Sequence, residues 1–477
     1  MTATQAPAPV VRPTEAPAAP AAPKRQLSVF DSTCIIVGII IGSSIYESTK
    51  GIASNLPGTM WLVGFWVIGG ALSLVGAMCY AELAGAYPRA GGDYVYLTRA
   101  YGRPVGFLFA WAQLWIVRPG SIGTLAYVFA RYANELRPLK VSQPLIIYAA
   151  ASIFVLSAIN VLGVRQGKWT QNLLTVAKVL GLVGVTVAGL WPVAPTPAPS
   201  AAAMSWDPNT AWDPRYVLIM IFLAYGGWNE MAYVAAEVRN PQRNILRSLI
   251  VGTVAVTLIY VLVTLGFVHG LGYSTVATTK PVAAQVLRMR VGEWGARGAS
   301  LLICISALGS INGMIFTGAR ITYAMGAEHR LYAALGRWNP RLGTPLWSLI
   351  AQAIVTLALV IGFGWKKADE GFDSLVIFTT PVFWIFFFLV GLSLFVLRVR
   401  EPNTERPYRV ALYPLIPMIF CASCLFMIYA GVSWALQNKS AEAWWSIGIL
   451  GAGVVLCFMD PRPAGSAQND PGAPNGA

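Results

Sequence analysis

A run of glycine and serine interrupts the first long apolar segment of this sequence. Residues 29–53 are long and apolar enough to cross a bilayer, and Gly38-Ile39-Ile40-Ile41-Gly42-Ser43-Ser44-Ile45-Tyr46 lies midway along them. A helix in lipid must satisfy its own backbone hydrogen bonds, because no water is present to do so. A break at this depth therefore predicts bare amides and carbonyls, which discontinuous membrane helices use to hold a ligand.

A second break lies in another apolar segment, at Ala224-Tyr225-Gly226-Gly227-Trp228-Asn229. Small residues also let membrane helices pack closely, so one glycine-rich stretch alone is weak evidence for a site. Two matching breaks, one in each half of the chain, favour a ligand site between two discontinuous helices. Half-helix N-termini would hold an anionic group there, and carbonyls would hold a cationic one.

The composition places the chain in a membrane. Of its 477 residues 56% are hydrophobic and 11% charged, and the mean hydropathy is +0.59, which excludes a soluble protein. The net charge of +14 comes from bases spread singly through loops, so we expect no nucleic acid binding. The six cysteines fall in apolar segments, where they act as small hydrophobes. We therefore expect no disulfide framework, no metal site and no cofactor.

Apolar segments of crossing length recur along the chain and predict an all-α polytopic membrane protein with twelve transmembrane helices. The expected spans are residues 29–53, 60–86, 104–132, 143–163, 171–192, 216–238, 246–269, 299–325, 344–363, 373–398, 412–436 and 441–459. The first five form one repeat within residues 27–192, and the next five form a second within 215–398. Since five is odd, the second repeat is inverted, and discontinuous helices 1 and 6 begin the two halves.

The remaining segments are connections and tails. Residues 399–459 hold the last two spans, and residues 193–214 form an extracytoplasmic loop. The Pro-, Ala- and Gly-rich stretches 1–26 and 460–477 read as disordered cytoplasmic tails. Cytoplasmic placement of both termini leaves most Lys and Arg residues on the cytoplasmic side, as the positive-inside rule requires. We therefore expect a multi-pass protein of the cell (inner) membrane.

Three stretches resemble the L-type amino acid transporters of the amino acid/polyamine/organocation superfamily, in a prokaryotic-type form. They are GIIIGSSIY at 38–46, GAMCYAELAGAYPRAGGDYVYL at 76–97 and AYGGWNEMAYVAAEVRNPQRN at 224–244. IVRPGS at 116–121, GSINGMIFTGAR at 309–320 and ERPYRV at 405–410 also match, so the resemblance covers about residues 29–414. It implies a secondary active transporter that exchanges neutral L-amino acids by alternating access, independently of sodium.

The resemblance also implies where the substrate binds. Amides of Gly42, Ser43 and Ser44 would hold its carboxylate, as an open helix N-terminus can. Carbonyls of the first and sixth spans would hold its amine. The substrate-binding candidates are Ile40, Ile41, Gly42, Ser43, Ser44, Leu223, Gly226, Trp228, Asn229 and Asn312. Two of them depart from the family, which usually has Gly at Ser44 and a Phe lid at Leu223.

Lys178 is a charged residue near the middle of the fifth span and is a functional candidate for that reason. The resemblance implies that it replaces the sodium ion that links the first and eighth spans in related carriers. It would bond first-span carbonyls and eighth-span hydroxyls such as Ser306 or Ser310. The alternative is that Lys178 snorkels to a membrane surface, which its central position disfavours.

Glu230 follows the second break, where the family commonly has a neutral aromatic residue. It can pair with Lys178 or Arg118, face the pocket, or lie in a watery vestibule. A titrating Glu230 in the pocket would support the alternative function, a proton-coupled amino acid or amine symporter. The resemblance to neutral exchangers favours pairing or solvation. Tyr225 joins Lys178 and Glu230 as the third candidate for coupling or gating.

A polytopic membrane enzyme is the competing class of function. Such an enzyme needs a nucleophile, an acid and base, or a metal cluster assembled at membrane depth. No such constellation is apparent in the apolar segments of this sequence. The sequence therefore favours a carrier.

The loop at residues 134–143 contains no cysteine. Animal members of the L-type family use a cysteine after the third span to join a heavy-chain glycoprotein, so we predict no disulfide-linked heavy subunit here. The purified single chain should transport amino acids when reconstituted alone in liposomes. A folded chain that stays inactive until a second protein is added would contradict this prediction.

Overall fold

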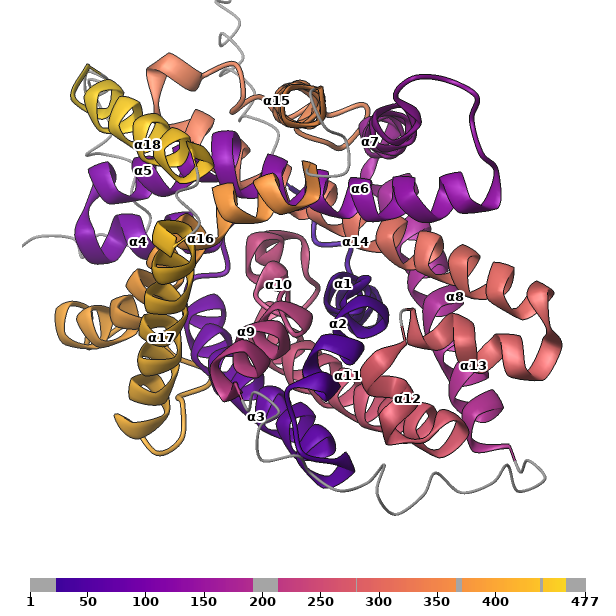
Figure 1. The fold of residues 1–477 in the computed structure, drawn as a ribbon. Helices are drawn as coiled ribbons and strands as arrows, with labels where there is room; N and C mark the ends of the chain where they lie inside the picture. The colour runs from indigo at the N-terminus through magenta and orange to yellow at the C-terminus, as the bar shows by residue number, and fades with distance from the viewer. Residues whose placement is uncertain (1–22, 192–212, 280, 366–370, 438–440, 460–477) are drawn as a thin grey trace, which may run out of the picture.

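The computed structural model describes residues 23–191, 213–279, 281–365, 371–437 and 441–459. These residues form helices almost throughout, and their only β pairing is two isolated bridges. The expectation of an all-α polytopic membrane protein is confirmed. In Figure 1, α1, α2 and α10 lie at the centre of the bundle and longer helices surround them.

The first half of the chain begins with the expected broken helix. Its elements are α1 (Val29–Ile40), α2 (Ser44–Ser54), α3 (Thr59–Ala86), α4 (Asp93–Tyr101), α5 (Arg103–Ala112), the π-helical η1 (Gln113–Val117), α6 (Arg118–Leu136), α7 (Pro144–Leu162) and α8 (Val164–Leu190). Ser28 and Asp31 form a capping box that fixes the start of α1. The helix ends at Ile40, and α2 resumes at an angle of 46°.

The third expected span is one helix with a π-helical turn in the middle. Residues 103–136 run through α5, η1 and α6 without a break. Pro119 has no N–H to donate to the preceding turn, which accounts for the wider turn just before it. The turn brings Gln113 and Arg118 to the same side of the helix, where their side chains bond.

The second half of the chain again begins with a broken helix. Its elements are α9 (Pro214–Ala224), α10 (Glu230–Tyr233), the 3₁₀ turn η3 (Ala235–Glu237), α11 (Pro241–Leu271), α12 (Tyr273–Thr278), α13 (Val282–Val291), α14 (Glu293–Glu328), the 3₁₀ turn η4 (Arg330–Tyr332), α15 (Leu346–Gly364), α16 (Gly371–Arg400), α17 (Leu415–Gln437) and α18 (Ala441–Met459). The break expected in the second half is thus present between α9 and α10.

Eight of the described helices are long and apolar enough to cross a membrane, and the bent pair α1 and α2 makes nine. The total of twelve, and the division into two repeats, stay predictions. The short helices α4, α12 and α13 were not expected, because they are too brief to give an apolar periodicity. The expected tails at residues 1–22 and 460–477, and the loop at 193–212, lie outside the described residues.

Candidate functional site

The two helix breaks face each other at the centre of the bundle. Gly227 has a φ of 111°, and a Cβ there would lie 2.6 Å from Ile39 Cγ2 of α1. Glycine is required on both counts, since other residues rarely adopt this φ and would clash with α1. Tyr260 Oη of α11 lies 3.0 Å from the Ile40 carbonyl oxygen and 3.1 Å from that of Ala224. One hydroxyl therefore bridges the ends of α1 and α9.

The first break leaves the start of α2 open. Ser43 is the N-cap residue of α2, yet its side chain makes no capping hydrogen bond. Gly42 N donates to the Ile40 carbonyl oxygen at 2.7 Å, which turns the chain between the two half-helices. Ile41, Gly42 and Ser43 are all buried. A helix N-terminus of this kind presents amides and a partial positive charge to an anionic group.

Lys178 closes the end of α1. Its Nζ donates to the carbonyl oxygens of Gly38 at 2.7 Å, Ile41 at 2.7 Å and Ser306 at 2.9 Å. The last carbonyls of a helix have no partner within it, and the C-terminal end carries a partial negative charge that favours a cation. Lys178 is 0% exposed, so it does not snorkel to a surface. The predicted bonds to first-span carbonyls are present.

The predicted bonds from Lys178 to eighth-span hydroxyls are not what the structure shows. On α14 the ammonium binds the Ser306 carbonyl, and the hydroxyls point to α1 instead. Ser306 Oγ lies 2.9 Å from the Gly42 carbonyl oxygen, and Ser310 Oγ lies 3.0 Å from that of Gly38. An ammonium has only donors, and both serine hydroxyls are used as donors to the same break. Together they satisfy carbonyls that α1 leaves unpaired.

The aromatic residues of the second break point away from α1. Trp228 packs its ring 5.2 Å from Tyr80 of α3 and 5.4 Å from Phe387 of α16. Tyr225 donates its hydroxyl to the Trp66 carbonyl oxygen at 2.8 Å. Leu223 is 46% exposed. A cavity of about 20 Å³, the size of one water, lies beside Gly226 and Trp228.

Asn229 and Asn312 do not lie together. Asn312 of α14 donates to Gln171 Oε1 at 2.9 Å and to the Gly167 carbonyl oxygen at 3.2 Å, and accepts from Asn160 at 2.8 Å. Both N–H groups of its amide bond to α8 and its oxygen accepts from α7, and its role in substrate binding stays a prediction. Asn229 donates to the hydroxyl of Tyr233 at 3.0 Å.

Glu230 pairs with Arg118. Glu230 Oε2 lies 2.7 Å from Arg118 Nη1, and each side chain is 5% exposed. Thr317 of α14 donates to the same carboxylate oxygen at 2.5 Å, and Arg118 Nε donates to Gln113 Oε1 at 3.1 Å. Among the alternatives for Glu230, pairing with Arg118 is confirmed and pairing with Lys178 is wrong.

Of the residues around the two breaks, sequence reasoning missed Gln113, Tyr233, Tyr260 and Thr317. Their only signal is a polar group inside an apolar segment.

Further contacts tie the starts and ends of the broken helices at one side of the bundle. Leu27 and Val238 form a parallel β-bridge, which joins the segment before α1 to the segment after α10. Lys168 of α8 pairs with Asp31 at 3.3 Å. Arg320 of α14 pairs with Glu237 at 2.8 Å, where both side chains are buried. Opening this side would require these contacts to separate.

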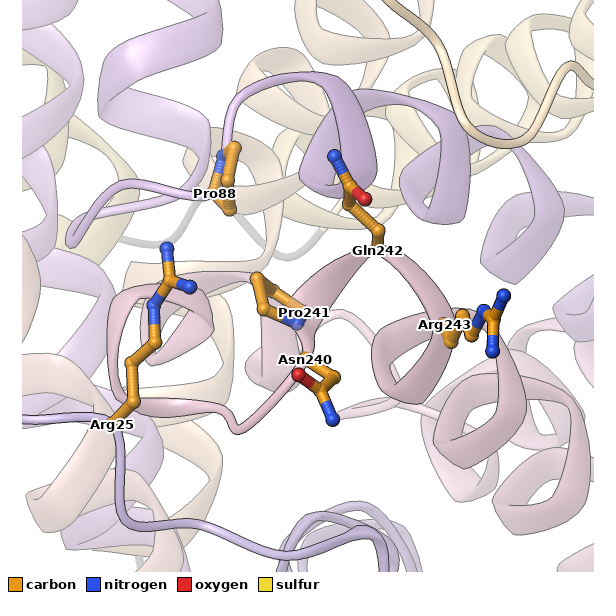
Figure 2. A pocket seen from close by; sticks show the side chains of 6 residues that line it. All are labelled: Arg25, Pro88, Asn240, Pro241, Gln242 and Arg243. Carbon is orange, nitrogen blue, oxygen red and sulfur yellow. The ribbon is translucent and has the colours of Figure 1, made fainter.

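A separate pocket lies beside these contacts. It has a volume of about 480 Å³ and lies at the start of α11, where Figure 2 shows its side chains. The lining residues are Arg25, Pro88, Asn240, Pro241, Gln242 and Arg243. None of the residues of either break lines it, so it is not the expected substrate site.

Two facing helix breaks inside a bundle of membrane-length helices define a secondary carrier. The sequence profile of the family described as amino acid permease matches residues 27–457. The chain therefore belongs to the amino acid permease family. It is a multi-pass membrane protein that transports amino acids. Members of this family are transporters and not enzymes.

Curated relatives support the resemblance to the L-type branch. The chain is 29% identical to the b(0,+)-type amino acid transporter 1 of Homo sapiens over 450 residues, which cover 91% of this chain and 88% of the relative. It is 28% identical to the Mus musculus protein of that name over 446 residues, with coverage of 91% and 88%. It is 26% identical to the Large neutral amino acids transporter small subunit 2 of Homo sapiens over 459 residues, with coverage of 92% and 83%.

Lys178→Ala should slow the transport cycle. The substitution removes three hydrogen bonds from a charged donor, each worth about 1.5–3 kcal/mol, and leaves the carbonyls with serine hydroxyl donors alone. If about 1.4 kcal/mol of this loss raises the barrier to the conformational change, exchange should slow by about tenfold. The order in which amino acids compete should stay unchanged. Exchange and competition in proteoliposomes measure both quantities.

Lys140→Ala is the matched control for Lys178→Ala, because Lys140 is an exposed lysine in a loop. It should leave exchange unchanged. A Lys178→Ala protein with normal exchange but a new order of competing amino acids would contradict the role of Lys178 in the cycle.

Glu230→Gln should destabilise the protein. It leaves Arg118 buried without a counter-charge, which costs about 3–5 kcal/mol when one member of a buried ion pair is removed. Thermal unfolding of the purified protein in detergent should show a clear loss. Glu293→Gln is the control, since its pair with Arg288 is exposed and such pairs contribute about 0–1 kcal/mol.

The double variant Arg118→Gln/Glu230→Gln tests whether the two side chains stabilise the protein as a pair. It should be more stable than the sum of the two single changes predicts, because neither charge is then left alone. Additive losses would mean that the two side chains do not act as a pair.

Proposed function

We propose that this protein exchanges neutral L-amino acids across the cell membrane without sodium. The observation that carries the proposal is the Lys178 ammonium bound to Gly38, Ile41 and Ser306 between α1 and α14. A fixed cation at the end of α1 supplies the positive charge that a coupling ion would otherwise bring. The carrier then needs no ion gradient, and exchange of one amino acid for another is the transport that remains.

The substrate's amino and carboxyl groups fit the backbone of the two breaks. The start of α2 at Ser43 and Ser44 suits a carboxylate, because no side chain caps its amides. Gly42 N, the third proposed donor, bonds the Ile40 carbonyl and would have to leave it to bind the substrate.

The Leu223 carbonyl oxygen lies at the C-terminal end of α9, where the partial negative charge of a helix end favours an ammonium, and it accepts there from Gly226 N at 3.4 Å. The carbonyls of Gly226 and Ile40 complete the proposed set. The Ile40 oxygen accepts from Gly42 N and Tyr260 Oη, so the ammonium would replace one of these donors there.

The charges around the second break favour substrates with neutral side chains. Glu230 is the acid nearest the break in the sequence, and Arg118 already neutralises it. A cationic side chain would gain little from a carboxylate held in a tight ion pair. The substrate class in the name of one relative, the Large neutral amino acids transporter small subunit 2, agrees with this proposal. The same ion pair weighs against the symporter alternative in which Glu230 titrates.

In alternating access, one side of the bundle must open, and three contacts hold one side of this bundle closed. Separation of Leu27 from Val238, of Asp31 from Lys168 and of Glu237 from Arg320 would free α1 and α10 together. We assign this side to the cytoplasm, on the basis of the Lys and Arg distribution in the loops. The cell membrane location and the absence of a linked heavy subunit are parts of the same proposal.

Counterflow in proteoliposomes tests the proposed function. Liposomes loaded with an unlabelled neutral amino acid should take up the labelled one, and replacement of sodium by choline should not change the rate. Empty liposomes should show little uptake, because exchange requires internal substrate. A strict sodium requirement, or preference for cationic over neutral amino acids, would overturn the proposal.

A further inference from the structure

Asp93 is a buried acid that the proposed cycle does not use. It begins α4, in the connection between α3 and α5, and is 1% exposed. Its Oδ2 accepts from the hydroxyl of Tyr80 at 2.9 Å and from that of Tyr233 at 2.7 Å. Its Oδ1 is buried and has no hydrogen-bond partner within the described part of the chain. The two oxygens of one carboxyl thus have opposite surroundings.

This asymmetry suits a carboxyl that takes up a proton. An ionised carboxylate carries charge on both oxygens, and each oxygen then needs donors. A buried charged oxygen without a donor is costly, because the protein interior does not replace its water. A proton on Oδ1 removes that charge and leaves Oδ2 free to accept from both tyrosines. The geometry therefore favours protonation at Oδ1.

No cation in the described structure forms an ion pair with Asp93. The ionisable groups that act on it are Tyr80 of α3, Tyr96 of α4, Arg118 of α6, and Tyr233 and Glu230 of α10. Arg118 is the cation among them, and its bonds go to Glu230, Gln113 and Thr317. Burial raises the pKa of Asp93 to about 7, against the lowering effect of the two tyrosine hydroxyls.

Asp93 also lies where it can affect the broken sixth span. Tyr233 is the last residue of α10, and its hydroxyl accepts from Asn229 at 3.0 Å while it donates to Asp93. Tyr80 attaches the same carboxyl to α3. The carboxyl therefore joins α3 and α4 to the short half of the second broken helix.

We propose that Asp93 is a proton-binding site of this carrier, protonated at Oδ1, and that its ionised form holds α10 against α3 and α4. Uptake of a proton from the aqueous phase converts the carboxylate to a carboxylic acid. Hydrogen bonds to a neutral acceptor are about half as strong as those to a charged one, so α10 is released. Exchange is then faster at lower pH. The inference rests on the proposed alternating-access exchange.

The test is the rate of exchange in proteoliposomes with the same pH on both sides, from about pH 6 to about pH 8. The parent should slow several-fold as pH rises through the Asp93 transition. Asp93→Asn imitates the protonated form and should stay fast and independent of pH. Tyr80→Phe removes a donor to the ionised form, so its transition should shift to higher pH. Asp213→Asn, an exposed helix cap, is the matched control and should behave like the parent.

An infrared measurement keeps the test independent of transport. The carbonyl stretch of a protonated, buried carboxyl should titrate near neutral pH in the purified parent and be absent in Asp93→Asn. Sodium-independent exchange with the same pH profile in the parent and Asp93→Asn would overturn this inference and leave the proposed function intact. An infrared band that persists in Asp93→Asn would also overturn it.

Discussion

The bond between Lys178 and the end of α1 is the interaction on which the central site depends. A helix that stops inside a bilayer leaves its last carbonyls without partners and without water. Lys178 binds two carbonyls at this end, those of Gly38 and Ile41, and a third on α14. Ser306 and Ser310 of α14 donate to the carbonyls of Gly42 and Ile39. This capping lets α1 end at Ile40 and lets the chain turn toward α2. The open amides that suit a substrate carboxylate follow from that turn.

The second break is held by a different set of polar groups. Glu230 is fixed by Arg118 and Thr317, while Tyr233 is fixed by Asp93 and Asn229. These partners come from α4, α6 and α14 and from the N-cap residue of α10, so three other helices meet on a helix of four residues. A helix this short has little stability of its own, because helix formation has a costly nucleus. Its position therefore depends on these side chains.

The most accurate sequence predictions concern features that are visible locally. The breaks at Gly42 and Gly226 could be predicted, because two matching glycine-rich interruptions occur in long apolar segments. The carbonyl contacts of Lys178 could be predicted from its charge at membrane depth together with the resemblance to the L-type transporters. The partner of Glu230 could not be chosen among its alternatives, since Arg118 is distant in the sequence and is aimed by the π turn at Gln113 to Val117. The role of Asn312 stays a prediction. This residue is polar and on the expected span, but its amide is committed to Asn160 and Gln171.

The sequence by itself determined the class of molecule, the places where two helices break, and the family, because these depend on composition and on short motifs. Only the tertiary structure decided which polar groups pair. A buried charge takes whichever partner the packing brings within about 3 Å, and that partner can come from any helix. The pairing of Glu230 with Arg118, the bridge from Tyr260 to both breaks, and the unpaired oxygen of Asp93 all arise in this way.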